Sequence, residues 1–331
     1  MRLRTWLSLF AAAGLAGGLA AALGGGVAQA GPAYPDHPIH YVLHVSPGGA
    51  TDVMARKLGS VLQKELKIPI VIENRPGGRG AAEMAIITHS KPDGYTIGSA
   101  TSTHLAEFHQ TLRQYNIHSV TWVARLVTDP YLFVVPAKSN IHSMKDLAAA
   151  IKADAGKMVV AGFVKGSGAN IAWEMFMSAA GLPASDVNWV PYNSVGGGVT
   201  AVLGGHGAAT VAYYGLVKDQ VAAGHLRVIG VIAPKRLADL PNVPTVEEQG
   251  YNVPTFWNQW RGIIAPANMP PAILAALDAD IKKAMESPDM QAYVKNNSLQ
   301  YDYAGSATFD TFIQQQDKVT LVWLKKLGFV K

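Results

Sequence analysis

Three glycine-bearing turns have the residue types needed to bind an anion through backbone N–H groups. Pro47–Gly49 joins an apolar, strand-like run to a helical pattern, and Gly166–Asn170 and Asn193–Gly198 repeat this arrangement later in the chain. The first N–H groups of a helix lack intrahelical partners, and the helix dipole adds partial positive charge there. Because glycine also lets a ligand approach the backbone closely, these turns predict anion sites.

A fourth turn, Pro76–Gly80, precedes another helical pattern. One glycine turn between a strand and a helix is usually structural. Two such turns in each half of the chain instead favour a cleft between two domains, because ligands of open α/β sheets lie outside the carboxyl ends of the strands.

The expected anion is a carboxylate rather than a phosphate. The stretch "GGRGAAEM" lacks the Lys-Ser/Thr ending of a P-loop, and no turn fits the dinucleotide pattern with an acidic residue about twenty positions later. Asp52 beside the first turn would repel a highly charged group. Neutral donors suit a carboxylate better, and the candidates are Ser46, Ser102, Ser167 and Asn170.

The sequence contains no pattern typical of catalysis, so no catalytic residue, metal ligand or cofactor is expected. A nucleophile elbow at Ser167 would need glycine two positions earlier, where Lys165 stands. His104 and His109 are five residues apart, not the four that bring two metal ligands onto one helix face. For the other histidines, including His44, a surface or packing role is the default.

The first thirty residues have the layout of a secretory signal peptide. A basic start is followed by a long apolar run and by Ala28-Gln29-Ala30, which predicts cleavage between Ala30 and Gly31. An uncleaved membrane anchor is the alternative, because the run is long enough to span a bilayer. Export without any cysteine indicates a soluble protein of the periplasm.

Composition places the rest of the chain among globular proteins. Hydrophobic residues make up 49% of the chain and charged residues 15%. The net charge of +5 is not gathered into a Lys/Arg block, so no nucleic-acid partner is expected.

Short apolar runs alternate with amphipathic patterns, which predicts an α/β fold with mainly parallel sheets. Apolar residues at helical spacing predict a helix over Thr51–Leu66 with Thr51 as its N-cap. Phe256–Pro266 is interpreted as a strand returning to the first domain, and Pro270–Lys331 as helical. The expected organisation is a signal peptide at 1–30, a first lobe of 31–130 plus 256–331, and a second lobe of 131–255.

The sequence resembles the extracytoplasmic solute receptors of tripartite tricarboxylate transporters, called Bug-type receptors. The similarity runs from Tyr34 to the C-terminus, and the matching stretches are "YPDHPIHYVLHVSPGGATDVMAR", "IVIENRPGGRG", "KPDGYTIG", "SMKDL", "VPYNSVGGG", "KRLADLPNVPTVEEQGY" and "WRGIIAPANMP". The resemblance implies a two-domain, type II periplasmic-binding clamshell with a ligand cleft between its lobes. It also implies the capture of an organic carboxylate and its delivery to membrane permease subunits. We expect a monomer whose ligand is a di- or tricarboxylate or, because of the aromatic residues named below, an aromatic acid.

In such receptors the first turn and the helix after it hold one carboxylate through backbone N–H groups and ordered water. By this likeness the ligand-binding residues are Ser46, Gly48, Gly49, Ala50, Asp52, Thr101, Ser102, Ser167, Gly168, Ala169, Asn170, Asn193, Gly196 and Tyr213. Asp52 is expected to order its turn rather than to contact the ligand.

Some positions depart from the pattern of the family. His44 and Val45 replace its usual proline and aromatic residue, and His44 adds a donor or, when protonated, a charge. Arg261 either pairs with a second carboxylate or lies on the surface without a role. The aromatic residues Tyr192, Tyr213, Tyr214, Trp257 and Trp260 either pack in the core or border the cleft.

Two other functions remain open from the sequence. The protein is either a transport receptor or a ligand-loaded sensor partner of a membrane kinase. A secreted hydrolase is less favoured, because it needs a nucleophile–base pair that the sequence does not offer.

Overall fold

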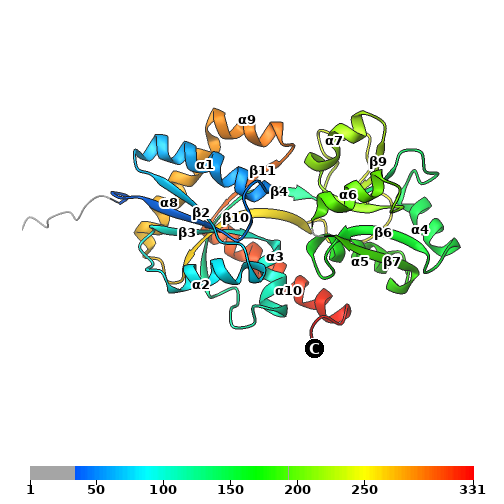
Figure 1. The fold of residues 1–331 in the computed structure, drawn as a ribbon, viewed down its shortest axis with the longest axis horizontal. Helices are drawn as coiled ribbons and strands as arrows, with labels where there is room; N and C mark the ends of the chain where they lie inside the picture. The colour runs from blue at the N-terminus through cyan, green and yellow to red at the C-terminus, as the bar shows by residue number, and fades with distance from the viewer. Residues whose placement is uncertain (1–33, 193) are drawn as a thin grey trace, which may run out of the picture. The chain divides into compact units, whose positions relative to one another are not determined.

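The structure, a computed structural model, describes residues 34–192 and 194–331 (Figure 1). The predicted signal peptide at 1–30 and Asn193 therefore lie outside the described residues. Within the described ranges, no helix combines the length and the apolar character that crossing a bilayer requires.

The largest sheet has six strands and mixes both strand directions. In spatial order they are β11 (Gln300–Gly305), β4 (Val120–Pro130), β10 (Asn258–Pro266), β3 (Thr96–Thr101), β1 (Ile39–Leu43) and β2 (Ile70–Asn74). β1 runs parallel to β2 and β3, whereas β10 is antiparallel to β3 and β4. The prediction of a mainly parallel sheet was therefore wrong for this sheet, because β4, β10 and β11 add antiparallel pairs.

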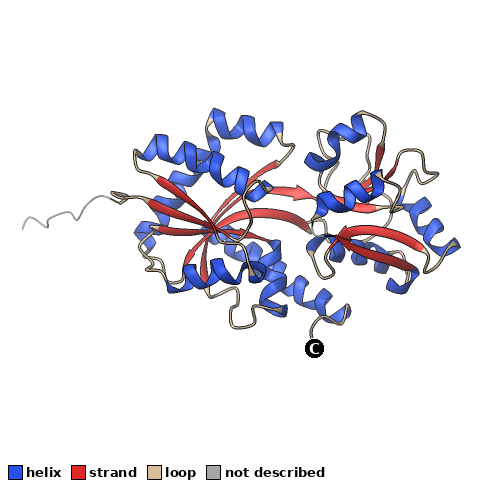
Figure 2. Cartoon of the chain, in the orientation of Figure 1, coloured by secondary structure: helices blue, strands red, loops and turns tan. Residues whose placement is uncertain are grey.

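Helices cover both faces of this sheet (Figures 1 and 2). Alternate residues of β1 point to opposite faces, so Ile39 and Leu43 share one core with Leu58, while Val42 shares another with Met84. The helices around the sheet are α1 (Ala50–Leu66), α2 (Ala81–His89), α3 (Ser102–Gln110), α8 (Pro271–Glu286), α9 (Pro288–Asn296) and α10 (Ser306–Lys326). A single 3-10 turn, η1 (Gly78–Gly80), precedes α2.

The middle of the chain builds two smaller sheets around a separate core. One is antiparallel, with the order β8 (Thr210–Ala212), β5 (Leu132–Pro136) and β9 (Leu226–Val231), and the other pairs β6 (Met158–Phe163) with β7 (Val187–Tyr192) in parallel. Their helices are α4 (Met144–Ala153), α5 (Gly168–Ala179), α6 (Val195–Leu203), α7 (Tyr214–Ala222) and the 3-10 turn η2 (Ala184–Asp186). Phe133, Trp173 and Phe176 pack their rings together in this core.

Two strands and one helix connect the six-stranded sheet with the smaller sheets. β4 runs directly into β5, and β10 returns beside it, with Asn258 opposite Pro130. The predicted return strand is therefore confirmed, although it begins two residues later than expected. α10 contributes Phe309 to a core of the six-stranded sheet and Leu324 to the core of the smaller sheets.

Two strands escaped the sequence analysis. β4 was not identified, and β11 interrupts the segment after Pro270 that was expected to be helical. β11 is a short edge strand that pairs only with β4. Its sequence alternates Tyr301 and Tyr303 with the polar Gln300 and Asp302, a strand pattern that the helical interpretation of this segment overlooked.

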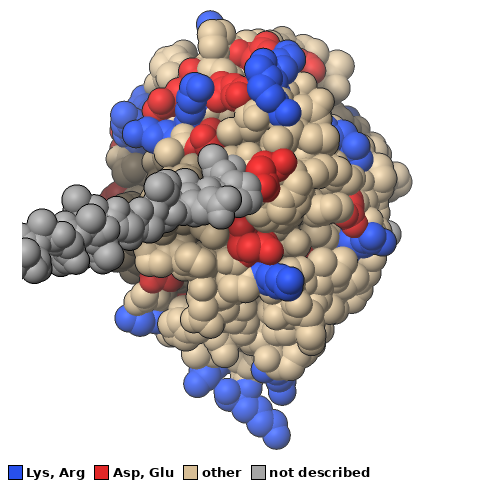
Figure 3. Space-filling model, turned by 90° about the vertical axis from the view of Figure 1, so that its left-hand side faces the viewer, with Lys and Arg blue, Asp and Glu red and all other residues tan. Residues whose placement is uncertain are grey.

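The surface charge agrees with the expectation drawn from composition. Figure 3 shows basic and acidic side chains side by side over the upper and middle parts of one face, and only basic side chains along its lower edge. On α1, for example, Lys57 and Lys64 both lie within 3.5 Å of Asp289.

Trp260 is the centre of an aromatic cluster under the six-stranded sheet. It is fully buried, with ring centroids 6.0 Å from Trp122 and 5.3 Å from Phe309. Trp257 is buried as well. Of the two roles left open for these tryptophans, the structure therefore supports core packing.

We predict that Trp260→Ala lowers the free energy of unfolding by about 3–5 kcal/mol, because it leaves a large cavity. Trp260→Phe should cost less, since Trp260 Nε1 has no hydrogen-bond partner among the described residues. Urea unfolding measures both values, with the half-buried Trp323→Ala as the control. An Ala variant as stable as the wild type would contradict this packing.

Candidate functional site

The first glycine turn leads from β1 into α1 and is open to solvent. Ser46, Gly48, Gly49 and Ala50 are all exposed. The N-cap is Gly49 rather than the expected Thr51, because Gly48, at φ +84°, turns the chain so that the helix begins at Ala50. Gly49 has no side chain to cap the first-turn N–H groups, which leaves them free for a ligand.

Asp52 lies beneath this turn and holds it in place. Its carboxylate accepts hydrogen bonds from the backbone N–H of Gly48 at 2.9 Å, from Asn74 Nδ2 at 2.8 Å and from Arg56 Nε at 3.0 Å. Burial alone would raise the pKa of Asp52, but the hydrogen bonds and the charge of Arg56 lower it to about 2. Both oxygens are thus engaged by the protein itself.

The second predicted pair lies where β3 ends and α3 begins. Thr101 is the last residue of β3 and the N-cap of α3, and Ser102 is the first residue of the helix. Both side chains are buried, and Ser102 Oγ donates to Gln259 Oε1 on β10.

The third predicted group forms the turn between β6 and α5. Ser167 caps α5 by accepting from the backbone N–H of Asn170 at 3.3 Å, and Asn170 Oδ1 accepts from the backbone N–H of Gly166 at 2.9 Å. Ala169 is buried behind them. Both side chains therefore accept from the backbone of their own turn, as Asp52 accepts from Gly48 in the first turn.

Gly168 brings this turn against residues of the six-stranded sheet. A Cβ atom at Gly168 would lie 2.1 Å from Tyr131 Oη and 3.4 Å from Ser102 Oγ. The carbonyl of Gly168 also accepts a hydrogen bond from Trp257 Nε1 at 2.9 Å. Ser102 of α3 and Gly168 of α5 therefore lie close together, with Tyr131 and Trp257 packed around them. Sequence analysis did not mention Tyr131 and left Trp257 open between the core and the cleft.

The predicted turn Asn193–Gly198 is described only in part. Gly196 is half-buried in the first turn of α6, which Ser194 caps by accepting from the backbone N–H of Gly197 at 3.0 Å. Gly196 lines neither of the two cavities described next, and the neighbouring Asn193 lies outside the described residues.

Two cavities border these turns. The first, here the Tyr213 cavity, has a volume of about 210 Å³ and is lined by Gly48, Ala50, Val53, Asp129, Tyr213, Gly215, Leu216, Arg261, Tyr293, Asn297 and Leu299. The second, the His44 cavity, has about 250 Å³ and is lined by His44, Arg79, Thr103, Ala106, Glu107, Phe163, Val164, Lys165, Gly166 and Ser167. Each is lined both by residues around the six-stranded sheet and by residues of the smaller sheets.

Arg261 contributes a neutralised charge to the Tyr213 cavity. It is buried, and its Nη1 lies 2.5 Å from Asp129 Oδ2. The alternative that placed Arg261 on the surface was therefore wrong. Burial and the nearby Asp129 raise the pKa of Tyr213, so its hydroxyl stays protonated and can donate into this cavity.

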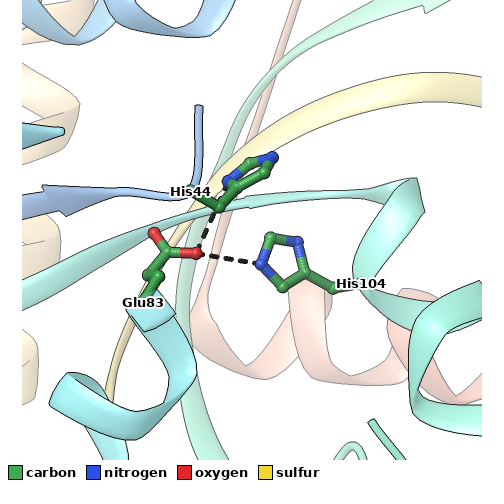
Figure 4. A group of neighbouring side chains, drawn as sticks. All are labelled: His44, Glu83 and His104. Carbon is green, nitrogen blue, oxygen red and sulfur yellow. Dashed lines mark hydrogen bonds and ion pairs between the residues drawn. The ribbon is translucent and has the colours of Figure 1, made fainter. Parts of the chain in front are cut away.

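A buried histidine–carboxylate cluster stands behind the His44 cavity (Figure 4). Glu83 Oε2 lies 3.0 Å from His104 Nε2 and 3.4 Å from His44 Nδ1, and the three ligand-type atoms all lie within 4.8 Å of one another. The residues come from α2, α3 and the end of β1. Sequence spacing gave no signal for this cluster, because its members are brought together only by the fold.

The hydrogen bonds of His104 disfavour a metal ion in this cluster. Its Nδ1 accepts from the backbone N–H of Thr101 at 3.3 Å, which places the proton of the neutral ring on Nε2, facing Glu83. A metal ion would need the lone pair of Nε2 instead. The cluster is therefore a hydrogen-bonded network.

Known proteins match most of the chain. A family model described as the tripartite tricarboxylate transporter family receptor matches residues 54–329. The protein BugT of Bordetella pertussis is 32% identical over 259 residues, which cover 77% of this chain and 78% of BugT. The chain belongs to the receptors of the tripartite tricarboxylate transporter family.

Solved structures establish the fold of this receptor. A TctC solute-binding protein from Polaromonas superposes with a TM-score of 0.77 at 23% identity, covering 88% of this chain and 99% of that one. MatC from Rhodopseudomonas palustris, with bound malate, gives 0.71 at 22% identity over 87% and 100% of the two chains. An R. palustris protein with adipate gives 0.74 at 21% identity over 89% and 98%.

These findings confirm the α/β periplasmic-binding fold, the receptor function and the family expected from the sequence. The family consists of substrate-binding receptors, not enzymes, which also confirms that expectation. The individual ligand contacts remain predictions.

We predict that Asp52→Asn lowers the free energy of unfolding near pH 7 by about 2 kcal/mol, because it removes a carboxylate whose pKa is about 2 when folded. A lowered pKa stabilises the fold above the unfolded value near 4. The difference between wild type and variant should therefore shrink as the pH falls from about 4 toward 2. Urea unfolding at several pH values tests this. The exposed Asp154→Asn is the control, and a pH-independent difference would contradict the prediction.

We predict that Gly168→Ala lowers the free energy of unfolding by about 1–3 kcal/mol, because its Cβ would overlap Tyr131 Oη. Adding Tyr131→Phe removes that oxygen and should restore part of the loss. Gly196→Ala is a matched control, since its Cβ meets nothing closer than 3.8 Å. Equal stability of the wild type and Gly168→Ala in thermal unfolding would show that the turn is not packed as described.

Proposed function

We propose that this receptor captures a small organic carboxylate, either a di- or tricarboxylate or an aromatic acid, between the turns that begin α1, α3 and α5. The observation that carries the proposal is the lining of the two cavities. Gly48 and Ala50 border one, and Gly166 and Ser167 border the other, and residues from both groups of sheets contribute to each. The starts of α1 and α7 thus border the Tyr213 cavity, and those of α3 and α5 border the His44 cavity.

The ligands of related structures support a carboxylate. The MatC structure contains malate and the other R. palustris structure contains adipate, and both are small dicarboxylates. The uncapped first turn of α1 offers N–H groups to such a group, and the acidic side chain beside it, Asp52, is fully engaged by the protein.

In this proposal the chain works as two lobes, 31–130 with 256–331 and 131–255, that close over the ligand. The strand pair β4 and β10 carries the chain between them, and closure about such connections is a common mechanism of binding proteins. The closed receptor is a monomer that presents the ligand to membrane permease subunits, without a nucleic-acid partner. It acts in the periplasm after cleavage between Ala30 and Gly31, and the family description supports an extracytoplasmic location.

A thermal-shift screen tests the proposal with malate, adipate, citrate, benzoate and the amides of these acids. A ligand at a hundred times its dissociation constant should add about 2.7 kcal/mol of stability. At least one acid is expected to raise the melting temperature, and its amide is expected to fail because it lacks the charge that the N–H groups bind. Equal shifts for acids and amides, or chemical turnover of a hit, would argue against a carboxylate receptor.

A further inference from the structure

His44 stands between the buried cluster and the His44 cavity. Its side chain is 10% exposed and lines that cavity. On the inner side, its Nδ1 lies 2.8 Å from Ser99 Oγ and 3.4 Å from Glu83 Oε2. Its ring meets that of His104 edge-on, with centroids 4.4 Å apart. The ring is thus fixed in orientation by its inner nitrogen.

The hydrogen bonds around Glu83 determine which nitrogen of His44 carries the proton. Glu83 Oε1 accepts from the backbone N–H of Ser99 at 2.8 Å and from Ser99 Oγ at 2.9 Å. Because Ser99 gives its hydroxyl proton to Glu83, its oxygen is left to accept from His44 Nδ1. The neutral ring of His44 therefore has its proton on Nδ1 and a free lone pair on Nε2. In Figure 4 this outer nitrogen points away from Glu83.

The charged groups that face His44 come from every neighbouring element. Glu83 on α2 and the imidazole of His104 on α3 lie on its inner side. On the cavity side are Lys165 before α5 and Arg79 on η1, whose Nη1 lies 3.0 Å from Glu107 Oε1 on α3. Arg79 and Glu107 offset each other, and Lys165 adds a positive charge to the lining that also acts on Glu174 of α5.

In the empty cavity, His44 is neutral near pH 7. Burial lowers its pKa, and the neighbouring His104 lowers it further, against the opposite effect of Glu83. A carboxylate that arrives at Nε2 would reverse this balance, because the protonated ring would then lie between two negative groups. Binding there is therefore coupled to proton uptake.

We propose that the His44 cavity is a subsite for the second carboxylate of a dicarboxylate, which His44 binds through Nε2–H after taking up one proton from solvent. This inference rests on the proposed function and narrows it, because it selects dicarboxylates over aromatic monoacids.

Two ligand pairs test the subsite by isothermal titration calorimetry: adipate with hexanoate, and malate with 2-hydroxybutyrate. Within each pair, a methyl group replaces one carboxylate. Within the pair that the wild type binds, its affinity for the dicarboxylate should exceed its affinity for the monocarboxylate by roughly ten- to hundredfold. This is the effect of one charged hydrogen bond. His44→Asn should lose that preference yet still bind the monocarboxylate. The Asn amide can replace the inner Nδ1 contact but has no group at the position of Nε2.

His40→Asn is the matched control. His40 also pairs through Nδ1 with a glutamate, at 2.6 Å from Glu73 Oε1, but on an exposed part of β1. The substitution His40→Asn should leave the preference for the dicarboxylate unchanged.

The pH dependence provides a second readout. The pKa of His44 is below its usual 6.5 in the free receptor and rises when the carboxylate binds. Affinity for the dicarboxylate should therefore increase as pH falls from 8.5 to 6, by up to about tenfold per unit within the window between the two values. Titrations in buffers of different ionisation enthalpy should show uptake of up to one proton, and His44→Asn should abolish it.

Several results would overturn the inference. Equal affinities within each pair, or proton-independent binding by the wild type, would leave the proposed function standing and remove the subsite. A rise in melting temperature with Zn²⁺ that His44→Asn abolishes would make the cluster a metal site instead. If no acid of either pair or of the screen binds, the proposed function fails, and the subsite fails with it.

Discussion

The structure depends on three buried carboxylates that hold the walls of the two cavities. A carboxylate removed from water must be paired or fully hydrogen-bonded, so each one fixes whatever donates to it. Asp52 fixes Gly48, Asp129 fixes Arg261, and Glu83 fixes Ser99 and His104. A receptor for anions can therefore keep acidic residues next to its site, because donors of the protein itself pair with their negative charge.

In the proposed function, neutral backbone donors bind the ligand. The first-turn N–H groups of α1 are uncapped, whereas those of α5 and α6 are capped by Ser167 and Ser194. The three turns that were alike in sequence therefore differ in how their helices are capped. The first turn of α1 has backbone N–H groups without a side-chain cap. The first turn of α5 is capped, and its Gly168 packs directly on Tyr131.

Local pattern predicted the turns well, because glycine, serine and apolar periodicity act over a few residues. It located the helices that follow the glycine turns, α1, α2 and α5, and the return strand β10, but placed the cap of α1 at Thr51 instead of Gly49. The helix α3 was not predicted, because Thr101 and Ser102 were interpreted as a loop. Local pattern did not predict the contacts between segments that are distant in the sequence. Glu83 and His104 meet because η1 sets α2 beside β3, and Gln259 reaches Ser102 because β10 pairs with β3. No spacing in the chain encodes these distances.

The two cationic side chains at the cavities differ in how permanent their charge is. Arg261 is always charged, and its buried charge is tolerated because Asp129 lies beside it at 2.5 Å. That pairing weakens its pull on a ligand. His44 can be neutral when its cavity is empty, so the free receptor avoids an uncompensated buried cation. The charge then arises only where a second anion is present to stabilise it. A fixed charge would attract any anion, whereas a conditional one responds to a ligand whose carboxylate reaches Nε2.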